Sequence, residues 1–415
     1  MHTGLLLPLR QGYCIVVSSS PPFHVVGISH HTASVALREQ LALTPLQISA
    51  WLERERREER SLMVLATCNR LELYWWGDED QEMSLRHLAQ RQGVALDSGV
   101  VYRCDGLPGV RHLFRVAAGL DSQVMGEYEI LGQLRRAHDQ AKVAGTTTWQ
   151  LDAAVSAALS AGRRVRQETR LGQHPGSVAS AALAQAALCW GGSLAEHRLM
   201  LLGAGEVADG VLRALESQAH GALVVANRTA DRAEVLAIAN GADTVFWEAL
   251  PRELARVDVV IAATSAPHPI LDSETLAAVV ESRAGRPLVV LDLAVPRNVD
   301  PGARDIAGLR LFDLDDLRLE YCPAVSGIAP SIDEAEKLID DGILRFERSL
   351  RVRAAAPLLA ELHSFGERLA EEETERALAQ LEALSAEERD VVRRMASRLV
   401  RRLLYPASQT IRENL

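Results

Sequence analysis

The chain has 415 residues, 48% of them hydrophobic and 24% charged, and its formal net charge at pH 7 is −10. This length is enough for about two or three domains, and the composition is that of an ordinary globular protein. The acidic balance excludes broad, nonspecific binding to nucleic acid, although a local basic surface for one specific RNA is compatible with it.

The spacing of the cysteines and the length of the apolar runs indicate the cellular compartment and argue against a metal site or a membrane span. The five cysteines are far apart, and no two have the spacing of metal ligands. This pattern predicts free thiols in a reducing, cytoplasmic compartment and no bound metal. No apolar run approaches the roughly 18 residues of a transmembrane helix, so we expect no membrane contact. Residues 1–22 are too interrupted for a good signal peptide, and we expect a disordered extension.

The first predicted domain, over residues 23–171, has the alternation of an α+β fold. Apolar runs and period-two alternation predict strands, whereas spacing of three and four predicts helices. The expected strands are 23–28, 62–66, 71–75 and 100–103, and the expected helices are 34–43, 45–57 and 82–92. Helical spacing then dominates residues 109–170, with probable loops at 119–122 and 126–127.

Two further domains follow a break at residues 172–176, which hold two glycines and Pro175. Over residues 172–313, strands at 199–202, 222–226, 244–246, 257–262 and 288–291 alternate with helices, which predicts a parallel, doubly wound Rossmann-like sheet. Over residues 314–415 the pattern is helical, with expected helices at 331–353, 357–384 and 386–404. Pro323 and Pro330 should keep the segment before residue 331 from forming one helix. This all-helical region either dimerises or caps its own subunit.

The run Thr67-Cys68-Asn69-Arg70 follows the apolar run 62–65. A cysteine at the end of a strand, with a guanidinium two residues on, is a plausible reactive thiolate, because a nearby cation lowers the pKa of a thiol. The thiolate is the nucleophilic form. We therefore expect Cys68 to form a covalent intermediate, with Arg70 as the activating cation.

A nucleotide-binding pattern follows the strand at 199–202. The motif G-x-G-x-x-A is made by Gly203, Ala204, Gly205, Glu206, Val207 and Ala208. Glycines allow a tight turn and close approach of a pyrophosphate, and the helix N-terminus favours its charge. The bare motif is weak evidence, but the strand-turn-helix context strengthens it.

The next strand points to the type of cofactor. An NAD site usually has Asp or Glu at the end of this strand, whereas here the chain has Asn227, Arg228 and Thr229. Arg228 could pair with a 2′-phosphate, so we predict NADPH. Alternatively, Arg228 is an ordinary surface arginine. Thr264 and Ser265, after the fourth strand, are expected beside the nicotinamide ribose, although this segment could be a purely structural turn.

Several motifs in the same order resemble the glutamyl-tRNA reductase family. Residues 27–33 (GISHHTA) are similar to its opening motif, and Thr67-Cys68-Asn69-Arg70 with Glu72 and Tyr74 is similar to its cysteine signature. The run from Arg111 to Ser122, followed by residues 126–127 and 130–133, resembles its most diagnostic segment. The resemblance covers nearly the whole chain from Phe23 to Leu404.

The resemblance implies a catalytic domain, an NADPH domain and a helical dimerisation domain in a homodimer, linked by a long helix. It implies that Cys68 attacks the ester of glutamyl-tRNA(Glu), and that NADPH reduces the resulting thioester to glutamate-1-semialdehyde. This is the first step of five-carbon tetrapyrrole (5-aminolevulinate, porphyrin) biosynthesis. Glutamate-1-semialdehyde aminomutase is an expected partner.

The resemblance also assigns substrate-binding roles around Cys68. Arg70 would clamp a carboxylate of the glutamyl group, and His112 would be the acid–base neighbour of Cys68. Other polar groups would recognise the remaining ends of the substrate: Thr67, Asn69, Ser122, Glu127, Glu129 and Gln133. Glu129 departs from the family, which usually has Gln there. His112 could instead be a packed helix histidine.

Two other functions are compatible with parts of this pattern. A simple NADP-dependent dehydrogenase of the shikimate-dehydrogenase type would have a similar nucleotide domain and would need no cysteine nucleophile. A non-catalytic, tRNA-binding regulatory paralogue would bind tRNA without forming a thioester.

Overall fold

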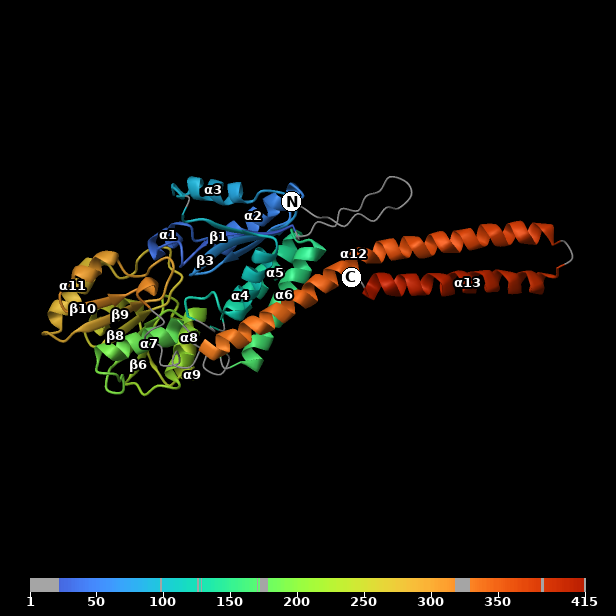
Figure 1. The fold of residues 1–415 in the computed structure, drawn as a ribbon. Coiled ribbons are helices and arrows are strands. Elements are labelled where there is room, and N and C mark those ends of the chain that lie inside the picture. The colour runs from blue at the N-terminus through green and yellow to red at the C-terminus, as the bar shows by residue number, and fades with distance from the viewer. Residues whose placement is uncertain are drawn as a thin grey trace. The chain divides into compact units, whose positions relative to one another are not determined.

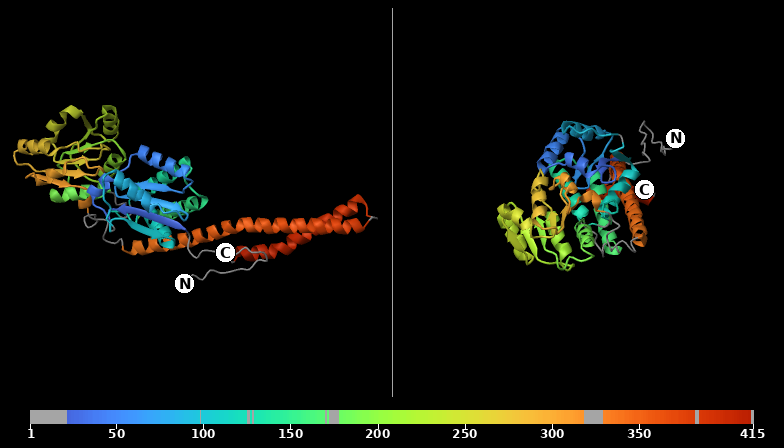
Figure 2. Two further views of the ribbon diagram at one scale, coloured as in Figure 1. Left: turned by 90° about the horizontal axis from the view of Figure 1, so that it is seen from above. Right: turned by 90° about the vertical axis from the view of Figure 1, so that its left-hand side faces the viewer.

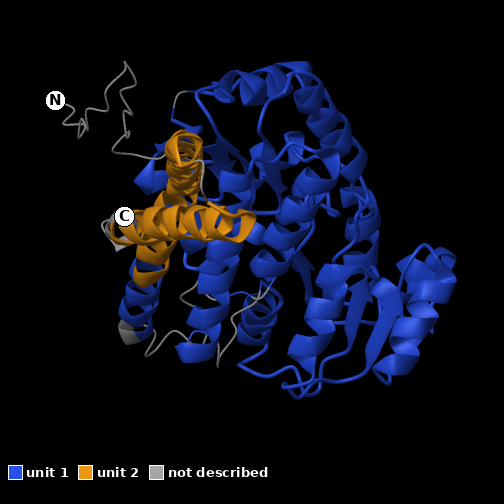
Figure 3. Ribbon diagram, turned by 90° about the vertical axis from the view of Figure 1, so that its right-hand side faces the viewer, with its two compact units in different colours: residues 1–340 blue, residues 341–415 orange. Residues whose placement is uncertain are grey.

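The computed structural model describes residues 22–97, 99–124, 127, 129–169, 171, 178–317, 329–381 and 384–413. The chain forms two compact units, residues 1–340 (unit 1) and residues 341–415 (unit 2), as Figure 3 shows. Three predictions fall outside the described residues: the disordered extension before residue 22, the break at 172–176 and the effect of Pro323.

Unit 1 begins with an antiparallel sheet of four strands in the order β2-β3-β1-β4. Its strands β1 and β3 are labelled in Figure 1. Apolar side chains of this sheet share a core with helix residues Trp51 and Leu52. The elements agree with the predicted pattern within two or three residues, which confirms the α+β character. The strands are β1 (Phe23–Ser29), β2 (Met63–Ala66), β3 (Arg70–Trp76) and β4 (Tyr102–Asp105), and the helices are α1 (Val35–Gln40), α2 (Pro45–Arg57) and α3 (Glu82–Arg91).

Three helices complete this part of unit 1: α4 (Leu107–Ala118), α5 (Glu129–Ala144) and α6 (Trp149–Glu168). Helices α4 and α6 approach so closely that a side chain at Gly162 would collide with the backbone of Ala117. The chain between α4 and α5 returns to the sheet, where Asp121 contacts Arg70 at the start of β3. This loop therefore carries its polar residues to the turn between β2 and β3.

The second part of unit 1 is a parallel sheet of six strands in the order β10-β9-β8-β5-β6-β7. Alternate side chains of the strands pack in two separate cores, one on each face, and helices cover both faces (Figure 2). This is the predicted doubly wound sheet. Its strands are β5 (Leu199–Leu202), β6 (Leu223–Ala226), β7 (Asp243–Val245), β8 (Val259–Ala262), β9 (Leu288–Asp292) and β10 (Leu309–Phe312), and its helices are α7 (Val178–Cys189), α8 (Glu206–Leu215), α9 (Ala230–Ala239), α10 (Leu250–Leu254) and α11 (Ser273–Ser282).

Two elements of this sheet region were not predicted. Helix α7 is apolar along most of its length, so its sequence lacks the polar face that marks an amphipathic helix. Strand β10 has only four residues, and it is a strand because Leu309 and Leu311 pack into the core beside β9. Both elements are set by tertiary packing and not by periodicity.

The C-terminal region is a helical hairpin of α12 (Ala329–Gln380) and α13 (Ala386–Glu413). The predicted break between residues 353 and 357 is wrong, because α12 continues through Pro357. A proline costs an interior helix about 3 kcal/mol, and the buried Ala355 and Leu359 stabilise the helix on both sides of it. The predicted end of the last helix at residue 404 is also wrong, because α13 continues through Pro406.

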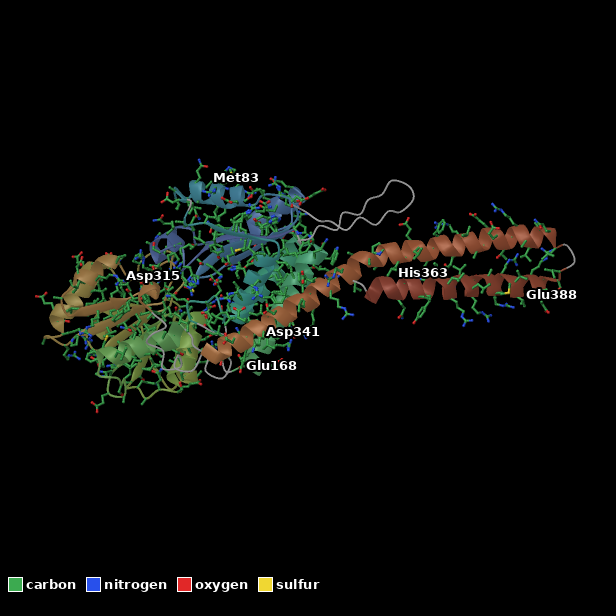
Figure 4. The ribbon with its side chains drawn as sticks, in the orientation of Figure 1. Met83, Glu168, Asp315, Asp341, His363 and Glu388 are labelled. Carbon is green, nitrogen blue, oxygen red and sulfur yellow. The ribbon has the colours of Figure 1, made fainter. Side chains whose placement is uncertain are left out.

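Within unit 2 the two helices contact each other through polar groups and through Gly366, which lies against Val400 and Leu404. His363, labelled in Figure 4, and Ser408 approach to 3.0 Å between Nε2 and Oγ. The hairpin nevertheless leaves many large apolar side chains exposed, which favours the predicted dimerisation over a cap on the same subunit. These residues are Val352, Phe365, Leu369, Leu381, Val391, Met395, Leu399, Leu403 and Tyr405.

Among the described residues, no helix combines the length and the apolar character that a membrane span requires.

Candidate active site

Cys68 lies in the tight turn that joins β2 to β3. The hydroxyl of Thr67 accepts hydrogen bonds from the backbone N–H groups of Asn69 (3.1 Å) and Arg70 (3.2 Å). The Thr67 N–H in turn donates to the Arg70 carbonyl at 2.8 Å. Thr67 therefore builds the turn, a structural role that the sequence prediction did not include.

The cavity beside Cys68 brings together residues that are distant in the sequence. Its volume is about 20 Å³, which is enough for about one water molecule. Cys68 is half-buried, and this cavity is too small for a glutamyl ester. The catalytic domain contributes Thr67, Cys68, Asn69, Glu127, Glu129 and Gln133, and the nucleotide domain contributes Val178, Ala179, Val207 and Leu293.

The predicted activation of Cys68 by Arg70 is wrong for this arrangement. Burial, together with the carboxyl groups of Glu127 and Glu129, raises the pKa of the Cys68 thiol to about 12, whereas Arg38 acts in the opposite direction. Arg70 is two residues away in the sequence, but its side chain turns to other partners. The spacing of residues in the sequence could not reveal the partners of Arg70, because spacing does not determine the direction of a side chain.

The guanidinium of Arg70 lies in a buried ion-pair network. Arg70 is 2% exposed and donates to Glu72 Oε1 at 2.8 Å, to Asp121 Oδ2 at 3.0 Å and to the Asp121 carbonyl. Glu72 also accepts hydrogen bonds from the hydroxyl groups of Tyr74 and Tyr102. Arg70 therefore neutralises buried carboxylates, and its proposed clamp on the substrate would have to use the same guanidinium.

The charge on Glu72 depends on this network. Burial alone would raise the pKa of Glu72, but the charges of Arg70 and His112 and the hydrogen bonds to the carboxylate hold it well below its usual value. Ligand atoms of Glu72, His112 and Asp121 lie within 4.8 Å of one another, as in a metal site. However, Arg70 already supplies a cation to both carboxylates.

His112 belongs to the same network. Its Nε2 lies 2.7 Å from Glu72 Oε1, and its ring meets the edge of Tyr102 at 5.5 Å between centroids. His112 is not among the residues that line the Cys68 cavity. The structure thus places the predicted acid–base residue against Glu72, and its pairing with Cys68 stays a prediction.

Glu127 is one of two glutamates that line the Cys68 cavity. It is 8% exposed, and burial, with a smaller contribution from Glu129, raises its pKa to about 7. The backbone carbonyl of Glu127 is held by Arg166 at 2.8 Å. A carboxyl group that titrates near neutral pH can take up or deliver a proton. Glu127 can therefore act in proton transfer, a role that goes beyond the substrate contact predicted for it.

A larger cavity lies near the Cys68 turn. It has a volume of about 550 Å³, and the backbone of His30 connects it to the turn by donating to the Asn69 carbonyl at 2.9 Å. The predicted residue Ser122 lines this cavity and not the small one. The lining residues are His30, His31, Thr32, Ala33, Ser34, Leu120, Ser122, Gln123, Asp315 and Leu317.

The nucleotide motif has the expected strand-turn-helix geometry. Gly203 has a φ of +118°, and a side chain there would collide with the carbonyl of Ala263. Gly205 precedes α8, and nothing lies within 4 Å of a Cβ placed on it. The turn therefore leaves open space at the N-terminus of a ten-residue helix, and these residues fit a pyrophosphate.

The neighbouring loops complete the nucleotide site. Strands β5 and β8 are adjacent at the point where the strand order reverses, which is where such sheets bind ligands. Thr264 follows β8, and its N–H donates to Asn298 Oδ1 at 2.9 Å, whereas Ser265 is exposed. At the end of β6, Asn227 Nδ2 donates to the Thr229 carbonyl at 3.0 Å.

Arg228 and Glu206 have different surroundings. Arg228 is exposed, and in the part of the chain that the structure describes its guanidinium forms no ion pair. Glu206, at the start of α8, pairs with Arg136 of α5 at 3.0 Å. Because α8 also supplies Val207 to the Cys68 cavity, the nucleotide turn and the cysteine belong to one site.

This fold and site define a multidomain oxidoreductase with a nicotinamide-nucleotide domain. Residues 26–169 match the family description "Glutamyl-tRNAGlu reductase, N-terminal domain", residues 183–319 match "Shikimate / quinate 5-dehydrogenase" and residues 334–414 match "Glutamyl-tRNAGlu reductase, dimerisation domain". The chain belongs to the glutamyl-tRNA reductase family. The match to the dimerisation domain supports a homodimer.

Individual relatives agree over nearly the whole chain. The chain is 36% identical over 392 residues to glutamyl-tRNA reductase of Alcanivorax borkumensis, covering 94% of this chain and 93% of the relative. It is 37% identical over 389 residues to the enzyme of Rubrobacter xylanophilus, covering 92% and 90%. The solved structure of the Methanopyrus kandleri reductase is 31% identical, covers 95% of this chain and 98% of its own, and has a TM-score of 0.47.

These relatives do not favour the dehydrogenase alternative. The shikimate-dehydrogenase description matches the nucleotide domain alone, whereas the reductase descriptions match the regions on both sides of it. Sequence reasoning missed the cavity-lining residues Val178, Ala179 and Leu293. It also missed Arg38, whose Nε donates to the Cys68 carbonyl at 3.1 Å. Thirty residues separate the two in the sequence, and no spacing rule connects them.

Proposed function

We propose that Cys68 takes the glutamyl group from glutamyl-tRNA(Glu) as a thioester, and that the thioester is reduced to glutamate-1-semialdehyde, the first step of five-carbon tetrapyrrole biosynthesis. The observation that carries this proposal is the shared cavity, in which Cys68 lies against Val207 of the nucleotide turn. An acyl group on the sulfur would therefore be near the nucleotide site.

The reaction has two stages, acylation of Cys68 and reduction of the thioester. The sulfur of Cys68 attacks the ester carbonyl, the carbon–oxygen bond to the tRNA breaks, and the released ribose hydroxyl takes a proton. When bound, NADPH supplies the hydride that reduces the thioester carbonyl. Collapse of the hemithioacetal then returns the thiolate and releases the aldehyde.

We infer that Glu127 moves protons during these steps. The thiol is protonated at neutral pH, since its pKa is about 12, and it must lose a proton before or during attack. The Glu127 carboxyl faces the same cavity and titrates near neutral pH, with a pKa of about 7. His112, which contacts Glu72, would support Arg70 and remains the predicted second acid–base group.

Unpartnered polar atoms support the proposed substrate contacts. Asn69 is 4% exposed, and its buried Oδ1 has no hydrogen-bond partner among the described residues. An unpartnered buried oxygen is costly unless a ligand satisfies it. The α-ammonium group of a glutamyl ester is such a donor, and Gln133, Glu127 and Glu129 line the same cavity.

The direct test is a single turnover with charged tRNA, with and without NADPH, followed by mass spectrometry of the Cys68 peptide. We expect a glutamyl adduct on Cys68 without NADPH and free aldehyde with it. Measurable tRNA binding without an adduct would instead indicate the non-catalytic paralogue. Equal NADPH oxidation with free glutamate would contradict the proposal altogether.

Changing Glu127 to Gln tests its proton-transfer role. We expect the acylation rate to fall about 100-fold, because the amide cannot exchange a proton. In the wild type, a step that needs ionised Glu127 should rise with pH through about 7, and this inflection should be absent from the variant. Glu129→Gln is the matched control, since it also removes from the cavity a carboxyl group whose pKa is raised. It should keep the inflection but move it to lower pH, because Glu129 contributes to the raised pKa of Glu127.

We propose NADPH as the cofactor, held at its 2′-phosphate by Arg228. Changing Arg228 to Gln should raise the KM for NADPH by about 10- to 100-fold, since charged hydrogen bonds contribute roughly 1.5–3 kcal/mol. The KM for NADH should change less than twofold. Direct binding of both nucleotides, followed by fluorescence, checks this without turnover, and equal losses for both would mean that Arg228 is an ordinary surface residue.

We further propose that the enzyme works as a homodimer in the cytoplasm, where reducing conditions keep Cys68 free. Its product is a reactive amino aldehyde, so direct transfer to glutamate-1-semialdehyde aminomutase would limit its loss. Trapping experiments with an added aldehyde scavenger would test the transfer: a channelled product should resist the scavenger.

A further inference from the structure

A buried arginine of helix α1 lies against the turn that carries Cys68. Arg38 is 4% exposed, and each of its three guanidinium nitrogens has a different partner. Nε donates to the Cys68 carbonyl at 3.1 Å, Nη1 to the Ala33 carbonyl at 2.9 Å and Nη2 to Asp315 Oδ1 at 3.0 Å. Arg38 is therefore fixed in one orientation relative to Cys68.

The carboxylate of Asp315 comes from the nucleotide part of unit 1. Asp315 lies in a short turn, Leu314–Asp316, just after β10, and is labelled in Figure 4. Its second oxygen accepts a hydrogen bond from the Val35 N–H, at the start of α1, at 2.6 Å. One carboxylate thus holds both the first turn of α1 and the guanidinium that reaches Cys68.

The charges around Cys68 oppose one another. Glu127 and Glu129 disfavour the thiolate, as does burial, and Arg38 favours it. The side chains that the nucleotide domain places in the cavity are apolar. A cation beside a peptide carbonyl both fixes the direction of that peptide and attracts negative charge on the adjacent sulfur. Asp315 weakens this attraction, because its carboxylate offsets the charge of Arg38.

We propose that Arg38 is a positioning residue that sets the geometry and reactivity of Cys68, and that Asp315 of the nucleotide domain restrains it. The inference rests on the proposed function for its purpose, since it assigns Arg38 to the acylation step. The effect of Arg38 on the reactivity of the Cys68 thiol does not depend on which substrate the enzyme uses. Through Asp315 and Arg38, the nucleotide domain has a charged connection to Cys68 in addition to the apolar contacts of the cavity.

The test measures alkylation of Cys68 by iodoacetamide between pH 7.5 and 9, with peptide mass spectrometry. Well below its pKa, the thiolate fraction changes tenfold for each unit of pKa. We expect Arg38→Gln to slow alkylation about tenfold and Arg38→Lys to slow it less. Asp315→Asn keeps one of the two acceptor oxygens and removes the charge, so it should speed alkylation about threefold to tenfold.

Another ion pair between α1 and the nucleotide domain provides a matched control. Glu39 of α1 pairs with Arg297 at 2.8 Å and is not among the groups that act on the Cys68 thiol. Glu39→Gln also removes one carboxylate charge, and we expect its alkylation rate to stay within twofold of the wild type. Alkylation of Cys104 in the same sample corrects for general changes in access.

Opposite shifts in the Arg38 and Asp315 variants support the proposal. An unchanged rate in Arg38→Gln, or a shift of the same sign in both variants, would overturn it, since loosening of the turn alone would act in one direction. If Arg38→Gln does not fold, the alkylation rates of Asp315→Asn and Glu39→Gln are compared instead. Equal rates in these two variants would reject the proposal. Single-turnover acylation should follow the same order, whereas a wild type without a glutamyl adduct would reject the proposed function and leave the alkylation result intact.

Discussion

Replacing Cys68 by serine is expected to abolish the glutamyl-enzyme adduct and to lower tRNA-dependent NADPH oxidation by at least about 1,000-fold. A serine hydroxyl is a far weaker nucleophile than a cysteine thiolate. Steady-state NADPH oxidation with charged tRNA, together with mass spectrometry of the Cys68 peptide, measures both effects.

The matched control is Cys104→Ser. Cys104 is a partly buried free thiol in β4, and we expect its replacement to leave the turnover within about twofold of the wild type. Full activity in Cys68→Ser would contradict covalent catalysis and would favour a simple dehydrogenase. Loss of activity in both variants would point to instability and not to chemistry.

Replacing Arg70 by methionine is expected to destabilise unit 1 by about 3–5 kcal/mol. Methionine occupies a similar volume, but it leaves Glu72 and Asp121 without their cation, and an uncompensated buried charge has roughly this cost. Thermal and denaturant unfolding curves measure the loss. We expect activity to disappear too, since the ion-pair network starts in the same turn as Cys68.

The pH dependence of this loss has a definite sign. The pKa of Glu72 in the folded protein lies well below its usual value of 4.5, so its ionisation stabilises the protein above that pH. This contribution is lost as the pH falls through the folded-state pKa, and the wild type should converge toward Arg70→Met in acid. Arg57→Met, which removes an exposed pair with Glu53, is the control and should cost less than about 1 kcal/mol.

Elements with clear periodicity were predicted close to their observed limits. Helix α2 begins at Pro45 and ends at Arg57 as predicted, since Thr44 and Gln47 form a capping box and Pro45 occupies the first turn. Strand β5 was also predicted to the residue, because a short apolar run before a glycine turn is a local signal. The boundaries of the three domains remain predictions.

Local signals failed where packing decided the outcome. The proline at 357 predicted a break, yet α12 runs through it. Arg70 lies two residues from Cys68 in the sequence and turns away from it, whereas Arg38, thirty residues earlier, donates to its carbonyl. Side-chain direction depends on the partners available after folding, and in this site those partners come from β3, α1, the loop after α4 and the nucleotide domain.

The sequence by itself determined the class of fold and the family resemblance, and it predicted Cys68 as the nucleophile, because these depend on residue types in local order. Only the tertiary structure decided how Cys68 is held. It surrounds the half-buried thiol, raises its pKa through burial and two carboxyl groups, and places the nucleotide turn in the same cavity. Burial and charge act across space between segments that the chain separates by more than a hundred residues, and no spacing in the sequence reports them.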